Sequence, residues 1–502
     1  MTSPTHQLTQ PQLESALWAA ANALRGPVDP GDYKAYVFPM LFFKWISDNW
    51  DHIHAQAVAD WGDKLTDDIE YSDYQPFVVP AGCHWADVHG TTLNLGAKVA
   101  NALGRIESAN RDLVGVFGDV NWASTHRLPE TALAALLDAF HGLRLDRDHV
   151  QGDMLGAAYE YLLREFAEAS GKKAGEFFTP RHVVHLLVKI LDPRPGETVV
   201  DPACGSGGML VETANAVRAA GGNPDSLRLN GQEINLTTSA IAKMNLYLHG
   251  LEDFRIRRGD TFREPRFTQG SRLEKFDVVI ANPPFSLQNW GAADWTSDAY
   301  GRVICAVPPA KNGDYAWIQH MIASMKDDTG RVGVVMPHGV LFRGGKEGEI
   351  RKCLLDKDLL EAVIGLPNNL FYSTSIPVCL LIWRKTKPAE RRGKVLFVDA
   401  SKRFKPGKNQ NNMAEDDVEA VLAAYQRGED IDGDGVLALR LVDLDEIADN
   451  NHDLNIGRYL QTAQVAEVDV EAALAAYHQS RDDLRAAERI LDAKLKAAGF
   501  NA

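Results

Sequence analysis

Four consecutive residues in the second half of the chain have the types and order needed to present a planar amine for alkylation. They are Asn282, Pro283, Pro284 and Phe285. An exocyclic purine amine is a weak nucleophile because its lone pair is delocalised into the ring. The side-chain carbonyl of Asn282 and the backbone carbonyl of Pro283 could accept its two hydrogens, and the prolines would keep both acceptors aimed. Because the Phe285 ring could also stack on an extruded base, the pattern favours an adenine N6 site over a merely stiff loop.

A glycine-rich turn upstream, DPACGSGG at residues 201–208, has the composition of a ligand cradle. It follows the apolar run 198–200 and precedes an expected helix at 209–220, so free backbone N–H groups would face a ligand there. The spacing differs from the GxGxxG of dinucleotide-binding proteins. Small side chains leave room for a ligand bulkier than a pyrophosphate. The candidate binding residues in this turn are Asp201, Ala203, Gly205, Ser206, Gly207 and Gly208.

Two acidic residues follow the next two expected strands. Glu233 stands where a carboxylate could accept from both hydroxyls of a ribose, and Asp260 could accept from the amino group of the same ligand. A single acidic residue after a strand is often a helix cap. Acidic residues after three successive strands, counting Asp201, are better explained by a nucleoside ligand.

The elements that must position these residues alternate between short apolar strands and helices. This alternation predicts an α/β fold with a doubly wound, mainly parallel but mixed sheet. The sheet signal fades beyond about residue 385. The expected strands are 198–200, 228–232, a weaker run before Gly259, 276–281, 330–337, 360–367 and 378–383.

The expected helices and strands divide the chain into three regions. Residues 1–150 read as a helical domain that begins at Thr9 and Pro11, residues 151–410 as the catalytic domain, and residues 411–502 as a C-terminal helical region. Apolar residues recur at helical spacing in 468–498, which suits an ordinary packed helix and a partner-binding helix equally well.

Composition limits the class of protein. The five cysteines form no CxxC pair, which argues against a disulfide framework and a structural zinc site and suits a reducing cytoplasm. The first residues carry no secretory signal, and no apolar run reaches the ~20 residues of a membrane span. We therefore expect a cytoplasmic protein without membrane contact.

Metal sites are not expected from the spacing of possible ligands. Asp430, Asp432 and Asp434 begin like a calcium loop, but Leu441 takes the place of the bidentate glutamate. His182 and His185 lie one helical turn apart without a carboxylate or cysteine at ligand spacing.

The four motifs AGEFFTPR, DPACGSGG, GQEIN and NPPF occur in an order that resembles the amino-methyltransferases, and most closely the modification subunits of type I restriction–modification systems. The resemblance spans roughly residues 150–410. It implies a Rossmann-like, class I S-adenosylmethionine-dependent methyltransferase that methylates adenine N6 in DNA. It further implies that Ser206 to Gly208 contact the cofactor, that Glu233 binds its ribose, and that Asn282, Pro283 and Phe285 hold the target adenine. The upstream motif would contribute six more cofactor contacts: Glu176, Phe177, Phe178, Thr179, Pro180 and Arg181.

The charge bears on how DNA would be held. The net charge is −15, although residues 255–275 and the loop 401–408 are locally basic. Only residues 409–502 follow that loop, and they read as acidic or helical, so a target-recognition region is missing. We therefore expect a separate specificity subunit. By resemblance, two modification subunits would flank one specificity subunit, and a restriction subunit would join them.

Two alternatives remain open from the sequence. The chain could methylate a protein glutamine or RNA, because NPP-aromatic sites also act on other planar nitrogens. It could also be a non-catalytic, cofactor-binding structural subunit.

Overall fold

A computed structural model describes residues 7–146, 148–150, 152–169, 179–371, 376–407, 410–428, 430, 433, 435–460 and 470–497. The chain forms two compact units, Met1–Ile456 and Gly457–Ala502. Among the described helices, none combines the length and the apolar character that crossing a membrane requires.

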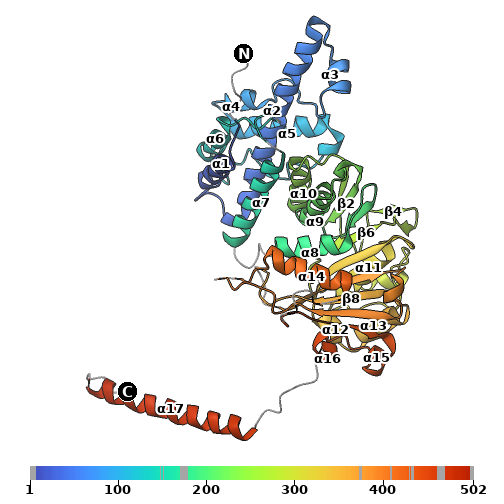
Figure 1. Cartoon of the computed structure of the whole chain (residues 1–502). Coiled ribbons are helices and arrows are strands. Elements are labelled where there is room, and N and C mark those ends of the chain that lie inside the picture. Colours follow the sequence, from blue (N-terminus) through green and yellow to red (C-terminus); the bar gives the residue numbers. More distant parts are fainter. Residues whose placement is uncertain are drawn as a thin grey trace. The chain divides into compact units, whose positions relative to one another are not determined.

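The first unit begins with helices, as the sequence predicts (Figure 1). Thr9 caps the first helix: its backbone N–H donates to Gln12 Oε1 at 2.9 Å, and Pro11 follows in the first turn. Seven α-helices are described up to residue 169: α1 (Gln10–Ala23), α2 (Tyr33–Trp61), α3 (Asp67–Asp73), α4 (Trp85–His89), α5 (Leu95–Ala109), α6 (Glu130–His141) and α7 (Gly152–Ala169).

A nine-stranded mixed sheet follows, in the order β11-β10-β8-β9-β7-β6-β1-β2-β3. Its central part is parallel, because β6 pairs with β1 and β7, and β2 pairs with β1 and β3, all in the same direction. Every strand expected from the sequence is present: β1 (Thr198–Asp201), β2 (Arg228–Glu233), β3 (Phe254–Arg258), β6 (Val278–Ala281), β7 (Arg331–Pro337), β8 (Leu360–Gly365) and β9 (Val378–Arg384). The predicted fold class is confirmed.

Helices connect and cover these strands. Leu187 of α8, Leu210 of α9 and Val421 of α14 share one apolar core with the sheet, and Figure 1 shows α8 and α14 side by side. The helices of this part are α8 (Arg181–Leu191), α9 (Gly208–Ala219), α10 (Leu236–Leu248), α11 (Asp314–Ser324), α12 (Gly339–Phe342), α13 (Lys346–Asp356), α14 (Glu415–Arg427), α15 (Leu444–Asp449) and α16 (Ile456–Leu460).

The sheet continues further along the chain than the sequence indicated. Strand β10 (Lys394–Asp399) pairs parallel with β8, and β11 (Ala438–Asp443) pairs antiparallel with β10. The expectation that the sheet fades beyond about residue 385 is therefore corrected. An edge strand has one unpaired side and needs few buried residues, and Leu441 of β11 is in fact exposed, so its apolar signal is weak. The boundary expected at residue 410 falls before α14 and β11, which pack on this sheet.

Helix α10 belongs to two packing layers. Ile241, Met244 and Tyr247 of this helix lie in the same apolar core as α1, α2 and α7. The hydroxyl of Tyr159 in α7 donates to the carbonyl of Ile241 at 2.9 Å. The N-terminal helices and the sheet therefore meet at α10.

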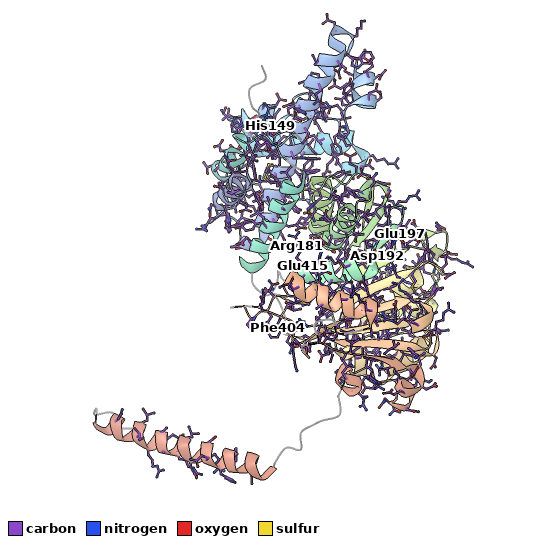
Figure 2. The ribbon with its side chains drawn as sticks, in the orientation of Figure 1. His149, Arg181, Asp192, Glu197, Phe404 and Glu415 are labelled. Carbon is purple, nitrogen blue, oxygen red and sulfur yellow. A yellow bond between two sulfur atoms is a disulfide. The ribbon has the colours of Figure 1, made fainter. Side chains whose placement is uncertain are left out.

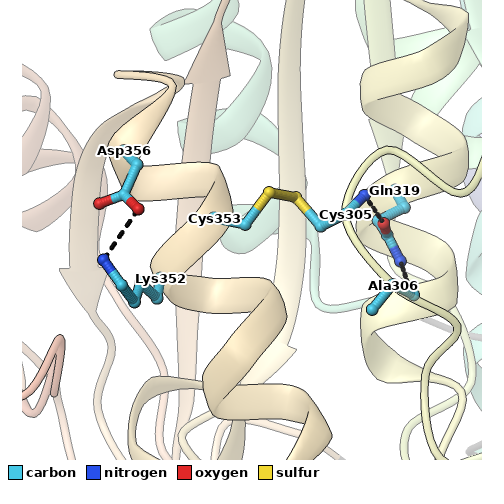
Figure 3. The surroundings of a disulfide bond; sticks show 6 residues. All are labelled: Cys305, Ala306, Gln319, Lys352, Cys353 and Asp356. Atoms are coloured by element: carbon cyan, nitrogen blue, oxygen red, sulfur yellow. Dashed lines mark hydrogen bonds and ion pairs between the residues drawn. A yellow bond between two sulfur atoms is a disulfide. The ribbon is translucent and has the colours of Figure 1, made fainter.

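One pair of cysteines departs from the expectation of no disulfide bonding. Cys305 and Cys353 form a disulfide that ties the segment before α11 to α13 (Figure 3). The backbone N–H of Cys305 also donates to Gln319 Oε1 at 3.0 Å. The sequence could not show this pairing because 48 residues separate the two cysteines. Cys83, Cys204 and Cys379 are free and buried.

In the second unit, α17 (Val470–Ala497) confirms the predicted C-terminal helix. Its described apolar side chains are exposed: Leu474, Tyr477, Leu484, Ile490 and Leu491.

Gly156→Ala should destabilise the first unit, because the added Cβ would lie 2.2 to 2.4 Å from the ring atoms of His249. Overpacking of this kind costs about 1–3 kcal/mol, and thermal unfolding followed by circular dichroism should show a lower Tm. Gly104→Ala is the matched control, since it also replaces a helical glycine but meets nothing within 4 Å. Removing a glycine from an open helix position should raise stability by roughly 0.5–1 kcal/mol. Equal effects from both variants would contradict this account of the α7–α10 contact.

Candidate active site

The carboxyl ends of four parallel strands bring the predicted site residues to one edge of the sheet. Asp201 ends β1, Glu233 ends β2, Asp260 follows β3 and Asn282 follows β6. Because β3, β2, β1 and β6 run in the same direction, all four ends lie on one edge, where ligands of open α/β sheets bind.

The glycine-rich turn closes tightly above β1. Gly205 and Gly207 adopt φ values of 53° and 80°, in the left-handed region that favours glycine. The N–H of Cys204 donates to the carbonyl of Gln232 at 3.0 Å, which fixes the turn to β2. Helix α9 then begins at Gly208, so its unpaired N-terminal N–H groups lie in the turn.

Glu233 is already joined to this turn. Its Oε2 accepts from the Gly205 N–H at 3.1 Å, and its Oε1 accepts from the Asn235 N–H at 2.8 Å. The side chain is buried, and this burial raises the pKa of its carboxyl group. Each carboxylate oxygen keeps a further lone pair, so the geometry still allows it to accept from a ligand hydroxyl.

Asp201 lies beneath the turn. Its Oδ1 accepts from the Ala203 N–H at 2.9 Å, and only 2% of the residue surface is exposed. Burial raises the pKa of Asp201 to about 8, and the negative charge of the neighbouring Glu233 acts in the same direction. The carboxyl group is therefore largely protonated at neutral pH, which avoids burying two negative charges together.

Asp260 mainly closes a turn. Its Oδ1 accepts from the Phe262 N–H at 2.9 Å and from the Arg263 N–H at 3.3 Å, while Oδ2 lies 3.8 Å from Arg263 Nε. These contacts match the capping alternative of the sequence analysis. A cofactor contact for Asp260 stays a prediction.

Asn282 presents one end of its carboxamide without a partner. Its Nδ2 donates to Thr179 Oγ1 at 2.9 Å, whereas Oδ1 is buried and accepts from no group within the described part of the chain. Pro283 is buried, Pro284 is exposed, and Phe285 is half-buried with its ring centroid 6.2 Å from that of Phe371. An acceptor and an aromatic face thus lie at the same strand end.

Asp314 and Arg343, which sequence reasoning missed, fix the backbone that follows Phe285. Ser286 has a φ of 52°, and its N–H donates to Asp314 Oδ1 at 2.7 Å. Asp314 is fully buried and also accepts from Arg343 Nη2 at 2.7 Å. No spacing signal could have identified this pair, because Asp314 and Arg343 lie 28 and 57 residues beyond Ser286.

The upstream motif is described only in part. Glu176, Phe177 and Phe178 lie outside the described residues. Pro180 caps α8, and Arg181 begins that helix with an exposed side chain, as Figure 2 shows. Thr179, which contacts Asn282, joins this segment to the strand-end site.

The two histidines that follow this motif, His182 and His185, are possible metal ligands by residue type. Burial lowers the pKa of His182 to about 4, and His185 contacts Glu212 at 2.5 Å and Glu415 of α14 at 3.1 Å. Within the described ranges, no three His, Cys, Asp or Glu side chains gather as a metal site. Asp432 and Asp434 of the calcium-like segment are outside those ranges.

The basic segments are partly neutralised. Arg255 pairs with Glu274 at 2.7 Å and Arg266 with Glu264 at 2.9 Å, while Arg403 in the loop 401–408 is buried. Within the described part of the chain, the exposed basic side chains of 255–275 that have no such carboxylate contact include Arg257, Arg258 and Arg272.

Known proteins are similar to this chain in sequence and in fold. The model of the family described as N-6 DNA Methylase matches residues 150–468, and the HsdM N-terminal domain matches residues 13–140. The chain is 36% identical over 383 residues to the type I restriction enzyme MjaVII methylase subunit of Methanocaldococcus jannaschii, covering 72% of this chain and 63% of that protein. It is 33% identical to the MjaVIII methylase subunit of the same organism, covering 93% of this chain and 81% of that protein.

A crystal structure of a similar protein matches the fold of this chain. The methyltransferase subunit of a type I restriction–modification system from Streptococcus thermophilus superposes with a TM-score of 0.78 at 32% identity, covering 90% of this chain and 100% of that one. The family model, the two relatives and the crystal structure agree, so the chain belongs to the N-6 DNA methylase family and is an adenine-specific DNA methyltransferase, the methylase subunit of a type I restriction–modification system.

Proposed function

We propose that the edge formed by β1, β2, β3 and β6 binds S-adenosylmethionine beside an adenine that has been flipped out of duplex DNA, and that Asn282, Pro283 and Phe285 hold this base. The observation that carries the proposal is the buried Oδ1 of Asn282, which has no hydrogen-bond donor among the described residues. A buried acceptor without a donor costs free energy, and an adenine amino group would supply the missing donor.

The residues around the glycine-rich turn fit such a cofactor. Gly205 and Gly207 let the backbone approach a ligand closely, and the Glu233 carboxylate is the ribose-binding group of the proposal. Thr179, Pro180 and Arg181 border the same edge, and the proposal includes Glu176 to Phe178 from the motif. When bound, S-adenosylmethionine supplies an activated sulfonium methyl group, so the protein needs to provide alignment more than a strong base.

The chain's own groups then act on the amine. The Asn282 side-chain carbonyl and the Pro283 backbone carbonyl accept the two amino hydrogens, which frees the nitrogen lone pair for attack. Positive charge develops on this nitrogen in the transition state, and the two carbonyl dipoles stabilise it. Stacking on Phe285 offsets part of the few kcal/mol needed to flip the base. The amine proton that leaves afterwards can pass to water.

The proposal assigns sequence recognition to other chains. The net charge of −15 and the carboxylate partners of Arg255 and Arg266 argue against broad DNA binding by this chain alone. A specificity subunit would select the DNA site, with two methylase subunits for each specificity subunit and a restriction subunit added for cleavage. The exposed apolar side chains of α17, such as Leu474, Tyr477 and Leu484, offer a surface for such a partner.

Asn282→Ala should slow methyl transfer by roughly 10²- to 10³-fold while cofactor affinity stays near the wild-type value, because this side chain serves the base. Losing one such acceptor should cost about 3–4 kcal/mol in the rate. The measurement is transfer of a labelled methyl group to duplex DNA in the complex with the specificity subunit, alongside calorimetric cofactor binding. Asn101→Ala, at an exposed position of α5, is the matched control. A parallel loss of cofactor binding in Asn282→Ala would contradict the assignment.

Glu233→Ala should show the opposite pattern and weaken cofactor binding first. A hydrogen bond to a charged group contributes about 1.5–3 kcal/mol, so the Kd should rise roughly 10- to 100-fold. Glu264→Ala removes another carboxylate close to the site, one that is exposed and pairs with Arg266, and should leave the Kd unchanged. An unaltered Kd in Glu233→Ala would refute its ribose role.

Asp201→Asn should flatten the pH dependence of stability without cofactor. The pKa of about 8 in the folded state lies above the ordinary 3.8, so the folded protein binds more protons between these values. This group's contribution to stability is therefore largest below about pH 4 and falls as the pH rises to 8. Melting temperatures measured from pH 5 to pH 9 should decline more steeply for the wild type than for Asp201→Asn, and parallel curves would exclude this titration.

A further inference from the structure

A carboxamide has two ends of similar shape and opposite hydrogen-bonding character. The oxygen accepts and the NH₂ group donates. The target amine of adenine is itself a donor, so only the oxygen end of Asn282 can receive it. If the carboxamide turned over, two N–H groups would face each other and the reaction would lose its acceptor.

The contact that the Asn282 carboxamide makes in its observed orientation comes from another part of the chain. Thr179 Oγ1 accepts from Asn282 Nδ2 at 2.9 Å, and Oδ1 is the end that has no partner in the described ranges. The two residues are separated by 103 positions in the sequence. Their contact therefore exists only when the segment before α8 is folded against the end of β6.

Thr179 is well placed to act as a fixed support. Pro180 follows it, which restricts the Thr179 backbone to extended conformations. The Pro180 carbonyl accepts from the N–H groups of Val183 and Val184 at 2.9 and 3.2 Å and so starts α8. This helix packs closely on β7, where a Cβ on Gly333 would lie 2.7 Å from Leu187 Cδ1.

We propose that Thr179 is a positioning residue for methyl transfer, which orients the Asn282 carboxamide so that Oδ1 faces the target amine. This proposal rests on the proposed function of Asn282, and for Thr179 it replaces the cofactor contact that the motif implies. Thr179 acts through Asn282 and does not itself touch the reacting atoms.

The test compares Thr179→Val, which removes the hydroxyl and keeps the shape, with Thr179→Ser, which keeps the hydroxyl. Single-turnover methyl transfer to duplex DNA is measured in the complex with the specificity subunit, together with the cofactor Kd and Tm of each variant. Loss of one neutral hydrogen bond should slow transfer by roughly 10-fold in Thr179→Val. The cofactor Kd and the Tm should stay near wild type, and Thr179→Ser should restore the rate.

Repeating Thr179→Val in the Asn282→Asp variant distinguishes an effect on the carboxamide orientation from a general loss of packing. In Asn282→Asp both ends of the side chain are oxygen, so orientation no longer matters. Adding Thr179→Val to Asn282→Asp should then change the residual transfer rate much less than it does in the wild-type background. An equal slowing in both backgrounds, an unchanged rate in Thr179→Val, or a Kd that rises in proportion to the lost rate would each overturn the proposal. Failure of the proposed role of Asn282 is recognised separately, because Asn282→Ala would then transfer methyl groups to adenine at the wild-type rate.

Discussion

The parallel alignment of β6, β1, β2 and β3 is the constraint on which the site depends. Each strand ends at the same edge, so one turn or side chain after each strand reaches a shared volume. A shift of one strand by a single residue would turn its side chains to the opposite face of the sheet. The buried register between β1 and β2, from Thr198–Arg228 to Asp201–Gly231, therefore determines where Asp201 and Glu233 meet.

Several polar groups at this edge are held away from water before any ligand arrives. The Asn282 oxygen has no donor in the part of the chain that the structure describes, Asp201 is kept protonated by burial, and Glu233 is fixed by two backbone N–H groups. Such an arrangement is less favourable for folding than a fully paired one. In return, the dipoles need little rearrangement during the reaction, which is the main electrostatic advantage of an enzyme site over water.

Local patterns in the sequence were enough to predict much of the fold. Apolar runs such as 276–281 and 330–337 are buried strands, and the glycine spacing of 201–208 marks a turn whose backbone conformation other residues rarely adopt. Contacts between distant positions were not accessible in this way. Ser286 with Asp314, Asn282 with Thr179, and Cys305 with Cys353 depend on how elements pack, and β11 is an edge strand with little apolar signal. The same limit applies to Asp260, whose Oδ1 closes a turn. Sequence spacing cannot distinguish an aspartate that closes a turn from one that binds a ligand.

The double packing of α10 links the N-terminal helices to the glycine-rich turn. Ala242 on this helix lies 3.4 Å from where a Cβ on Gly207 would be, and Asn245 Nδ2 donates to the Ser206 carbonyl at 3.0 Å. The neighbouring Ile241, Met244 and Tyr247 are covered by the N-terminal helices. A fragment beginning near residue 150 would expose these apolar side chains to water. Helix α10 would then pack against the turn without being covered on its other side. The N-terminal helices are thus part of the wall against which the turn is built, and they cannot be deleted as an independent appendage.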